Sequence, residues 1–157
     1  MADAAVTTAA INAWLASSPA VVRERSPMPD RHDEYVVLRG TDNVQGYVSA
    51  DTASRAALAN GQPVMLVPLD SGGSGTVFSA LVYTVIGGRT RFVGYIPSPA
   101  GHLGVHVVNG RIAVRTPVYG ANDPNCCPSA IHVEHDTLRG LRLVRLDAHD
   151  EPMRRPR

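Results

Sequence analysis

The chain has 157 residues, of which 44% are hydrophobic and 18% charged, and its formal net charge is +1. This length suffices for one domain with its own core, and the composition is that of a globular protein rather than a membrane protein. No apolar run approaches the ~20 residues of a membrane-spanning helix, and the near-neutral charge offers no broad positive surface to nucleic acid. We therefore expect no transmembrane segment and no nucleic-acid partner.

The first predicted element is a helix within residues 1–18, an alanine-rich stretch in which Val6, Ala10 and Trp14 follow a helical spacing. Ser18 and Pro19 supply a stop signal. We expect Trp14 to pack against the rest of the protein, which is a commoner role for a lone tryptophan than a ligand platform. Residues 19–33 contain three prolines and little periodicity, so they are predicted to form a linker.

Residues 34–148 are predicted to form a β-rich domain. Strands are expected over residues 34–39, 44–48, 63–69, 76–86, 89–96, 104–108, 111–116, 130–136 and 141–146. Residues 76–86 are apolar on both faces, which predicts a strand covered on both sides. The pairs Gly87-Gly88 and Asn109-Gly110 predict tight hairpin turns, since both central residues of a type I′ turn need positive φ.

Two segments interrupt this series of strands. Residues 51–60 combine a capping residue at their start, strong helix formers and a glycine just beyond, and therefore predict a short helix. Residues 149–157 are predicted to be a disordered tail. Strands with two helices and no βαβ alternation indicate an α+β, mostly β fold, with an antiparallel sheet of hairpins that forms an open layer or a partly closed barrel.

The only two cysteines, Cys126 and Cys127, are adjacent in a proline-bracketed loop. Asp123 and Pro124 suit the first two positions of a type I turn, and Pro128 disfavours a helical backbone at the residue before it. A bond between adjacent cysteines closes a strained, easily reduced ring because their Cα atoms are only about 3.8 Å apart. Two alternatives remain open: an intermolecular bridge, and two reduced thiols that pack as small hydrophobes. The pair is the disulfide or redox candidate.

The segment Asp70-Ser71-Gly72-Gly73 echoes the nucleophile segment of chymotrypsin-like serine proteases. Those enzymes place their histidine and aspartate before the serine, and His32, which alone among the histidines precedes this segment, lacks the family's context. A glycine- and serine-rich turn between two strands is the better interpretation.

Six histidines raise the question of a metal site, and His132 and His135 lie close to the cysteines in sequence. On a strand these two histidines point to opposite faces, and adjacent cysteines lack the gap that lets two thiolates share one zinc ion. We expect hydrogen-bonded or solvated histidines, with no metal and no other cofactor.

One pair of carboxylates, Glu134 and Asp136, shares a strand face. Because Arg142 and Arg145 occur on the following strand, an exposed cross-strand charge pair is expected, and we nominate no catalytic residue.

Three motifs together resemble a known class of protein: DSGGSG at residues 70–75, VNGRIAV at residues 108–114 and NDPNCCPS at residues 122–129. Widespread bacterial secreted or envelope-associated domains of unknown function share such a glycine-rich turn, hairpin and CCP loop. The resemblance covers residues 64–146 and implies an extracytoplasmic, cofactor-free, β-rich domain without indicating an activity. The first four residues lack the positive charge and long apolar run of a signal peptide, so the chain is either cytosolic or a mature form. The resemblance implies the second of these, a periplasmic or secreted chain whose signal peptide is absent from this sequence.

We therefore expect a non-enzymatic binding or structural module of the bacterial cell envelope. Its partner would be another protein, or a second copy of the chain that pairs through exposed edge strands. The alternative is a thiol-redox or other small enzyme that acts through the loop of Cys126 and Cys127. A third hypothesis is a hydrolase that uses Ser71 or Ser74.

Overall fold

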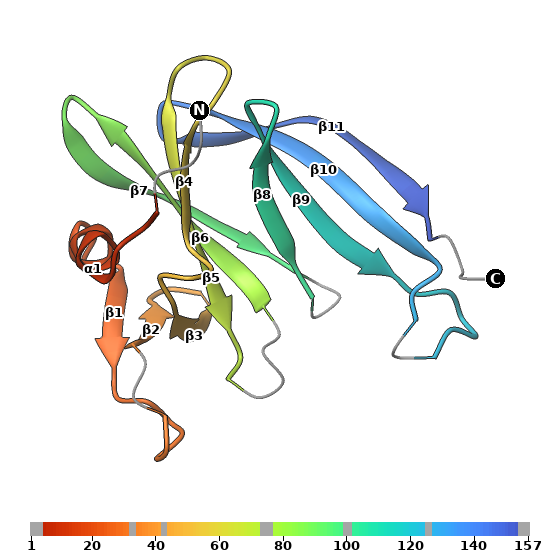
Figure 1. The fold of residues 1–157 in the computed structure, drawn as a ribbon, viewed down its shortest axis with the longest axis horizontal. Helices are drawn as coiled ribbons and strands as arrows, with labels where there is room; N and C mark the ends of the chain where they lie inside the picture. Colours follow the sequence, from red (N-terminus) through yellow and green to blue (C-terminus); the bar gives the residue numbers. More distant parts are fainter. Residues whose placement is uncertain are drawn as a thin grey trace.

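The computed structural model of the chain describes residues 5–31, 34–41, 44–72, 77–98, 102–124 and 127–153 (Figure 1). Within these residues it contains one helix, α1 (Thr8–Ala16), and eleven strands. In chain order the strands are β1 (Val21–Glu24), β2 (Glu34–Leu38), β3 (Gln45–Val48), β4 (Ser54–Ala57), β5 (Pro63–Asp70), β6 (Val77–Ile86), β7 (Arg89–Pro97), β8 (Gly104–Val108), β9 (Arg111–Val118), β10 (Ala130–Arg139) and β11 (Arg142–Pro152). No helix in the described part of the chain is both long enough and apolar enough to span a membrane.

The strands form two sheets in which every pairing is antiparallel. The first sheet has the order β1-β2-β3-β5-β6-β7, and β4 also pairs with β5. The second sheet has the order β11-β10-β9-β8. Both sheets are open, so the predicted α+β, mostly β fold is confirmed in its open form.

The hairpin of β5 and β6 lies at the centre of the molecule because both of its faces are covered (Figure 1). On one face lies the first core, which consists of Ile11, Trp14, Leu15, Val21, Val36, Leu38, Val44, Val48, Met65, Val67, Leu69, Leu81 and Tyr83. The other face packs against the second sheet in the second core, which consists of Leu58, Val64, Leu66, Ala80, Val82, Ile96, Leu103, Val105, Ile112, Val114 and Leu138. The predicted strand with two covered faces and the packing of Trp14 are both confirmed.

The two tight hairpins that the sequence predicts are present. Asn109 and Gly110 have φ values of 52° and 72°, and Gly87 and Gly88 have φ values of 59° and 76°. Positive φ at both central residues is what a type I′ turn requires, and this turn matches the twist of the flanking strands.

The helix predicted at residues 51–60 is wrong, because part of this segment is strand β4. Ser49 does start a turn, in which its carbonyl accepts hydrogen bonds from the N–H groups of Thr52 and Ala53, but the turn ends there. Beyond it, β4 pairs with one edge of β5, and Gly61, taken as a helix end, is the positive-φ residue of the hairpin between them. Pairing with an open strand edge outweighs helix propensity here, since a helix of this length would bury little more than Leu58.

Two further predictions need correction. The segment expected to be a linker, residues 19–33, contains strand β1, which pairs with β2. The disordered tail was predicted to begin at residue 149, which is too early. Strand β11 continues to Pro152 and pairs with β10 as far as Ala130. A polar strand was not expected there, but β10 provides backbone partners along its full length. Residues 154–157 lie outside the described residues.

Residues 58–62, which we call the bridging turn, connect the first sheet to both hairpins of the second. The N–H of Ala59 donates to the carbonyl of Gly110 at 2.9 Å. The side chains of Asn60 and Gln62 donate to the carbonyls of Leu138 and Gly140, each at 2.8 Å. The bridging turn thus fixes the two sheets relative to each other at one end of the second core.

Candidate functional site

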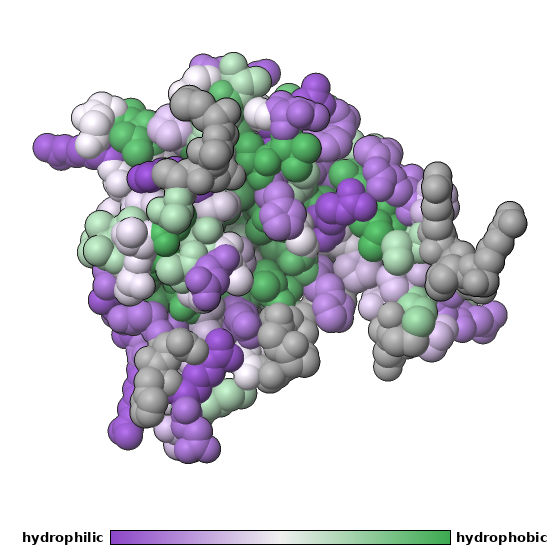
Figure 2. Space-filling model, viewed as in Figure 1, coloured by the Kyte–Doolittle hydropathy of each residue, from purple (hydrophilic) through white to green (hydrophobic). Residues whose placement is uncertain are grey.

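A pocket of about 320 Å³ lies where β7 of the first sheet faces β9, β10 and β11 of the second sheet. Its lining residues are Tyr95, Ile96, Pro97, Val114, Thr116, His132, Glu134, Asp136, Leu143 and Arg145. We call it the interlayer pocket. Figure 2 shows hydrophobic side chains in the middle of the molecule, where β5, β6 and β8 lie in Figure 1, with hydrophilic side chains around them. The interlayer pocket differs from that apolar centre in combining polar and apolar walls.

The polar wall of the pocket follows from the alternation of side chains along β10. His132, Glu134 and Asp136 are spaced two residues apart and therefore face the same way, toward the first sheet. Arg145 reaches the same face from β11 because the ladder shifts there: His135 pairs with Asp147, whereas Asp136 pairs with Arg145. The skipped residue, Leu146, forms a β-bulge.

Asp136 is the most unusual side chain of the pocket. Only 2% of its surface is exposed, and its Oδ1 atom has no hydrogen-bond partner among the residues that the structure describes. Burial raises the pKa of Asp136 to about 7, with further contributions from the charge of Glu134 and from a hydrogen bond to it, while Arg145 and His135 act in the opposite direction. The carboxyl therefore holds a proton up to nearly neutral pH.

The exposed charge pair expected at this strand face is only partly present. Glu134 does form an ion pair with Arg145, whose side chain is 64% exposed. Asp136, in contrast, is buried, because the first sheet covers its face of β10. Sequence reasoning recognised the shared face and missed the burial, since nothing in β10 itself shows which other sheet will lie over it.

The remaining walls give the pocket one polar end and one apolar side. His132 lies at the polar end, where its Nδ1 atom is 2.6 Å from Oδ1 of Asp150. Ile96, Val114 and Leu143 supply apolar contact. Such a pocket can hold a compact molecule that is apolar over part of its surface and gives a hydrogen bond or a positive charge to Asp136.

The cysteine loop lies elsewhere, between β9 and β10. Cys127 is exposed, and its N–H donates to the carbonyl of Pro124 at 2.9 Å. Asp123 closes the preceding turn, because its carboxylate accepts a hydrogen bond from the N–H of Gly120 at 2.6 Å. The described residues of the loop, Pro128 among them, do not line the interlayer pocket. Cys126 lies outside the described residues, so the state of the cysteine pair stays a prediction.

The glycine-rich segment after β5 is described as far as Gly72, whose N–H donates to Oδ1 of Asp70 at 2.6 Å. Gly72 has a φ of 89°, and a Cβ atom there would lie 2.5 Å from the ring of Tyr47, so only glycine fits. This part of the segment has the backbone of a turn. His32 and Ser74 lie outside the described residues, and the hydrolase hypothesis is untested.

Histidines of β10 and β11 lie on both faces of the second sheet. His132 points into the interlayer pocket, whereas His135 and His149 lie on the outer face, as the strand alternation predicts for the first two. No sequence pattern pointed to His149, because its segment was expected to be disordered. Comparisons with protein-family models, with curated proteins and with solved structures found no match to this chain.

Proposed function

We propose that the chain is a non-enzymatic binding module whose interlayer pocket holds a small organic amine with an apolar body. The observation that carries this proposal is the unpartnered Oδ1 atom of Asp136, a side chain 2% exposed at the wall of the pocket. A buried carboxyl oxygen without a partner costs free energy, and a ligand that donates a hydrogen bond to it removes that cost.

The charges around the pocket favour a cation over an anion or a neutral donor. The carboxyls of Glu134 and Asp136 lie side by side, and Arg145, the one arginine among the described residues that line the pocket, already pairs with Glu134. An ammonium group beside Asp136 would stabilise its ionised form. Amine binding near neutral pH should therefore release part of a proton from this carboxyl.

The dimensions of the pocket limit the ligand to a compact molecule. A cavity of about 320 Å³ is at the small end of the range in which proteins bind organic ligands. The apolar wall of Ile96, Val114 and Leu143 gives the rest of the molecule a favourable surface. Benzylamine and its neutral counterpart benzyl alcohol match these features and differ only in the donor group.

We expect benzylamine to bind in the pocket and benzyl alcohol to bind several-fold more weakly. Titration of the ¹⁵N-labelled chain, followed by ¹H–¹⁵N correlation spectra, measures both affinities and locates the site. The amides of Tyr95, Ile96 and Asp136 should shift with benzylamine. In Asp136→Asn the two probes should bind equally, because the charge that distinguishes them is gone. Asp51→Asn, a change at an exposed turn, is the matched control and should keep the preference.

Two results would contradict the proposal. One is a set of benzylamine shifts scattered over the surface, with none concentrated on β7, β10 and β11. The other is equal binding of the two probes to the unmodified chain, which would remove the role given to the carboxyl of Asp136.

For the location of the protein we propose the periplasm or the extracellular space. The resemblance of the CCP loop supports this, and in an oxidising compartment a bridge between Cys126 and Cys127 would persist.

The same proposal predicts the mass of the protein isolated without reductant. We expect it to be ~2 Da below the mass of the reduced form, as a bridge between Cys126 and Cys127 requires. Intact-mass spectrometry before and after reduction measures the difference, and Cys126→Ser should abolish it in the monomer. An identical mass with and without reductant, with both thiols open to alkylation, would contradict the bridge.

A further inference from the structure

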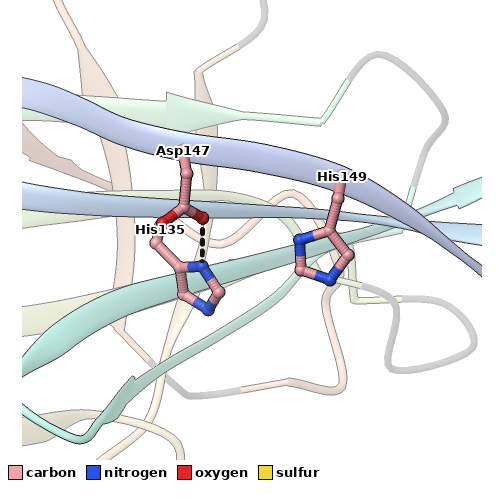
Figure 3. A group of neighbouring side chains, drawn as sticks. All are labelled: His135, Asp147 and His149. Atoms are coloured by element: carbon pink, nitrogen blue, oxygen red, sulfur yellow. Dashed lines mark hydrogen bonds and ion pairs between the residues drawn. The ribbon is translucent and has the colours of Figure 1, made fainter.

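The outer face of the second sheet carries a group of side chains that the interlayer pocket does not use. It consists of His135 of β10 and of Asp147 and His149 of β11 (Figure 3). One nitrogen or oxygen atom from each of them lies within 4.8 Å of the other two. We propose that these three side chains bind a divalent transition-metal ion of the zinc class, which combines well with imidazole and carboxylate ligands.

The backbone brings the three residues together. His135 lies directly opposite Asp147 in the antiparallel ladder, and His149 is two residues further along β11, so all three project from one face. The centroids of the two imidazole rings are 6.0 Å apart. Figure 3 shows both rings on the same side of the strand pair, with the carboxylate of Asp147 beside His135.

Two of the proposed ligands, His135 and Asp147, are already in direct contact. Nδ1 of His135 is 2.6 Å from Oδ1 of Asp147. An ion bound by Nδ1 of His135 and by a carboxylate oxygen of Asp147 would take the place of the hydrogen bond between them, because each atom would then direct a lone pair at the ion.

The three side chains need only a modest adjustment to reach ligand geometry. Zinc holds nitrogen and oxygen atoms at about 2.0–2.2 Å, so tetrahedral ligand atoms are roughly 3.3 Å apart. The side chains of His135, Asp147 and His149 are 24%, 49% and 49% exposed, which leaves them room to rotate. Water would complete the tetrahedron on the open side, as in other sites with three protein ligands.

Neighbouring charges set up a competition for the same carboxylate. Nη1 of Arg111 lies 3.0 Å from Oδ2 of Asp147, and Nε2 of His149 lies 3.1 Å from Oε1 of Glu151. A metal ion must draw Asp147 away from the guanidinium of Arg111. Replacement of Arg111 should therefore strengthen metal binding. Replacement of an arginine elsewhere on the chain should not.

Calorimetric titration of the full chain with zinc chloride tests the proposal, at about pH 7.5, where most imidazole is neutral. We expect one zinc ion per chain. His135→Ala and His149→Ala should each weaken binding roughly tenfold or more, and Arg111→Ala should tighten it several-fold. His106→Ala is the matched control, since His106 is exposed on the same face two strands from His135 and should leave the affinity unchanged.

Three further arms separate this site from other sources of binding. Double replacement of Cys126 and Cys127 by serine, and His132→Ala on the opposite face, should both retain zinc binding. Calcium chloride should give no saturable heat, since calcium prefers oxygen ligands. Urea midpoints within error of the unmodified chain would show that the variants remain folded. Absence of saturable zinc binding, its loss in the cysteine variant, or equal weakening by His106→Ala and His135→Ala would each overturn the proposal.

Discussion

Replacement of Leu66 by alanine is expected to lower the free energy of unfolding by about 2–5 kcal/mol. Leu66 is fully buried on β5 in the second core. The truncation removes buried methyl groups and leaves a cavity, which cannot easily collapse because β5 is hydrogen-bonded to β4 on one side and β6 on the other. Urea unfolding measures the change, and Leu141→Ala, at a side chain 39% exposed, is the control with a change of about 0.5 kcal/mol or less.

The same variant tests whether the two cores unfold together. Trp14 is the only tryptophan and packs in the first core, whereas Leu66 belongs to the second. Because β5 and β6 contribute to both cores, the fluorescence transition of Trp14 should move to lower urea by the same amount as the loss of β-sheet circular dichroism. A tryptophan transition that stays in place while the sheet signal shifts would show that the two layers unfold independently.

The second large effect concerns pH. The chain is expected to be less stable at about pH 8 than at about pH 5, and most of this difference should vanish in Asp136→Asn. The pKa of Asp136 rises from its ordinary value of 3.8 to about 7 in the folded chain. Between these values the folded state keeps a proton that the unfolded state has lost, so stability falls as pH rises through that range. Between pH 5 and pH 8 the fall is at most about 3 kcal/mol, because only the two pH units from 5 to about 7 contribute, at 1.36 kcal/mol each.

Other titrating groups do not obscure this result. The pKa values of Asp147 and Glu151 are lowered, chiefly by hydrogen bonds to His135 and His149, so these carboxylates lose stabilising contacts only as the solution becomes more acidic than the range compared. Every titratable side chain other than Asp136 is present in both proteins, so its contribution largely cancels in the difference. Urea curves at both pH values provide the measurement, with Asp51→Asn as the control that should keep the full pH dependence. An unchanged pH dependence in Asp136→Asn would mean that the burial of this carboxyl has no energetic consequence.

The sequence predicted those parts of the fold that depend on neighbouring residues. Asn109-Gly110 specifies its hairpin through the backbone preferences of two residues, and residues 76–86 reveal two covered faces by being apolar on both. Residues 51–60 show that local preferences alone do not decide the structure. Their helix propensity is real, but β5 has an open edge that only the folded chain presents, and pairing with it decides the outcome.

The candidate sites were less predictable than the fold, because they depend on contacts between strands that are far apart in the sequence. Strand alternation correctly separates His132 from His135 and groups Glu134 with Asp136. The burial of Asp136 depends on a different sheet, and the partnership of His135 with Asp147 depends on a strand extension that a polar sequence does not signal. Polar strands carry a weak pattern because hydrophobic alternation, the main indicator of a strand, is missing from them.

The bulge at Leu146 has a consequence for both faces of the second sheet. Arg145 and Asp147 are two positions apart, and in a regular strand they would project in the same direction. The additional residue sends Arg145 inward to Glu134 and Asp147 outward to His135. If the irregularity moved past Asp147, to position 148, that carboxylate would turn inward and the outer trio would lose a member. The partition of charge between the two surfaces thus depends on where the extra residue lies in β11, and moving it by two positions would reassign Asp147 to the other surface without altering a single amino acid.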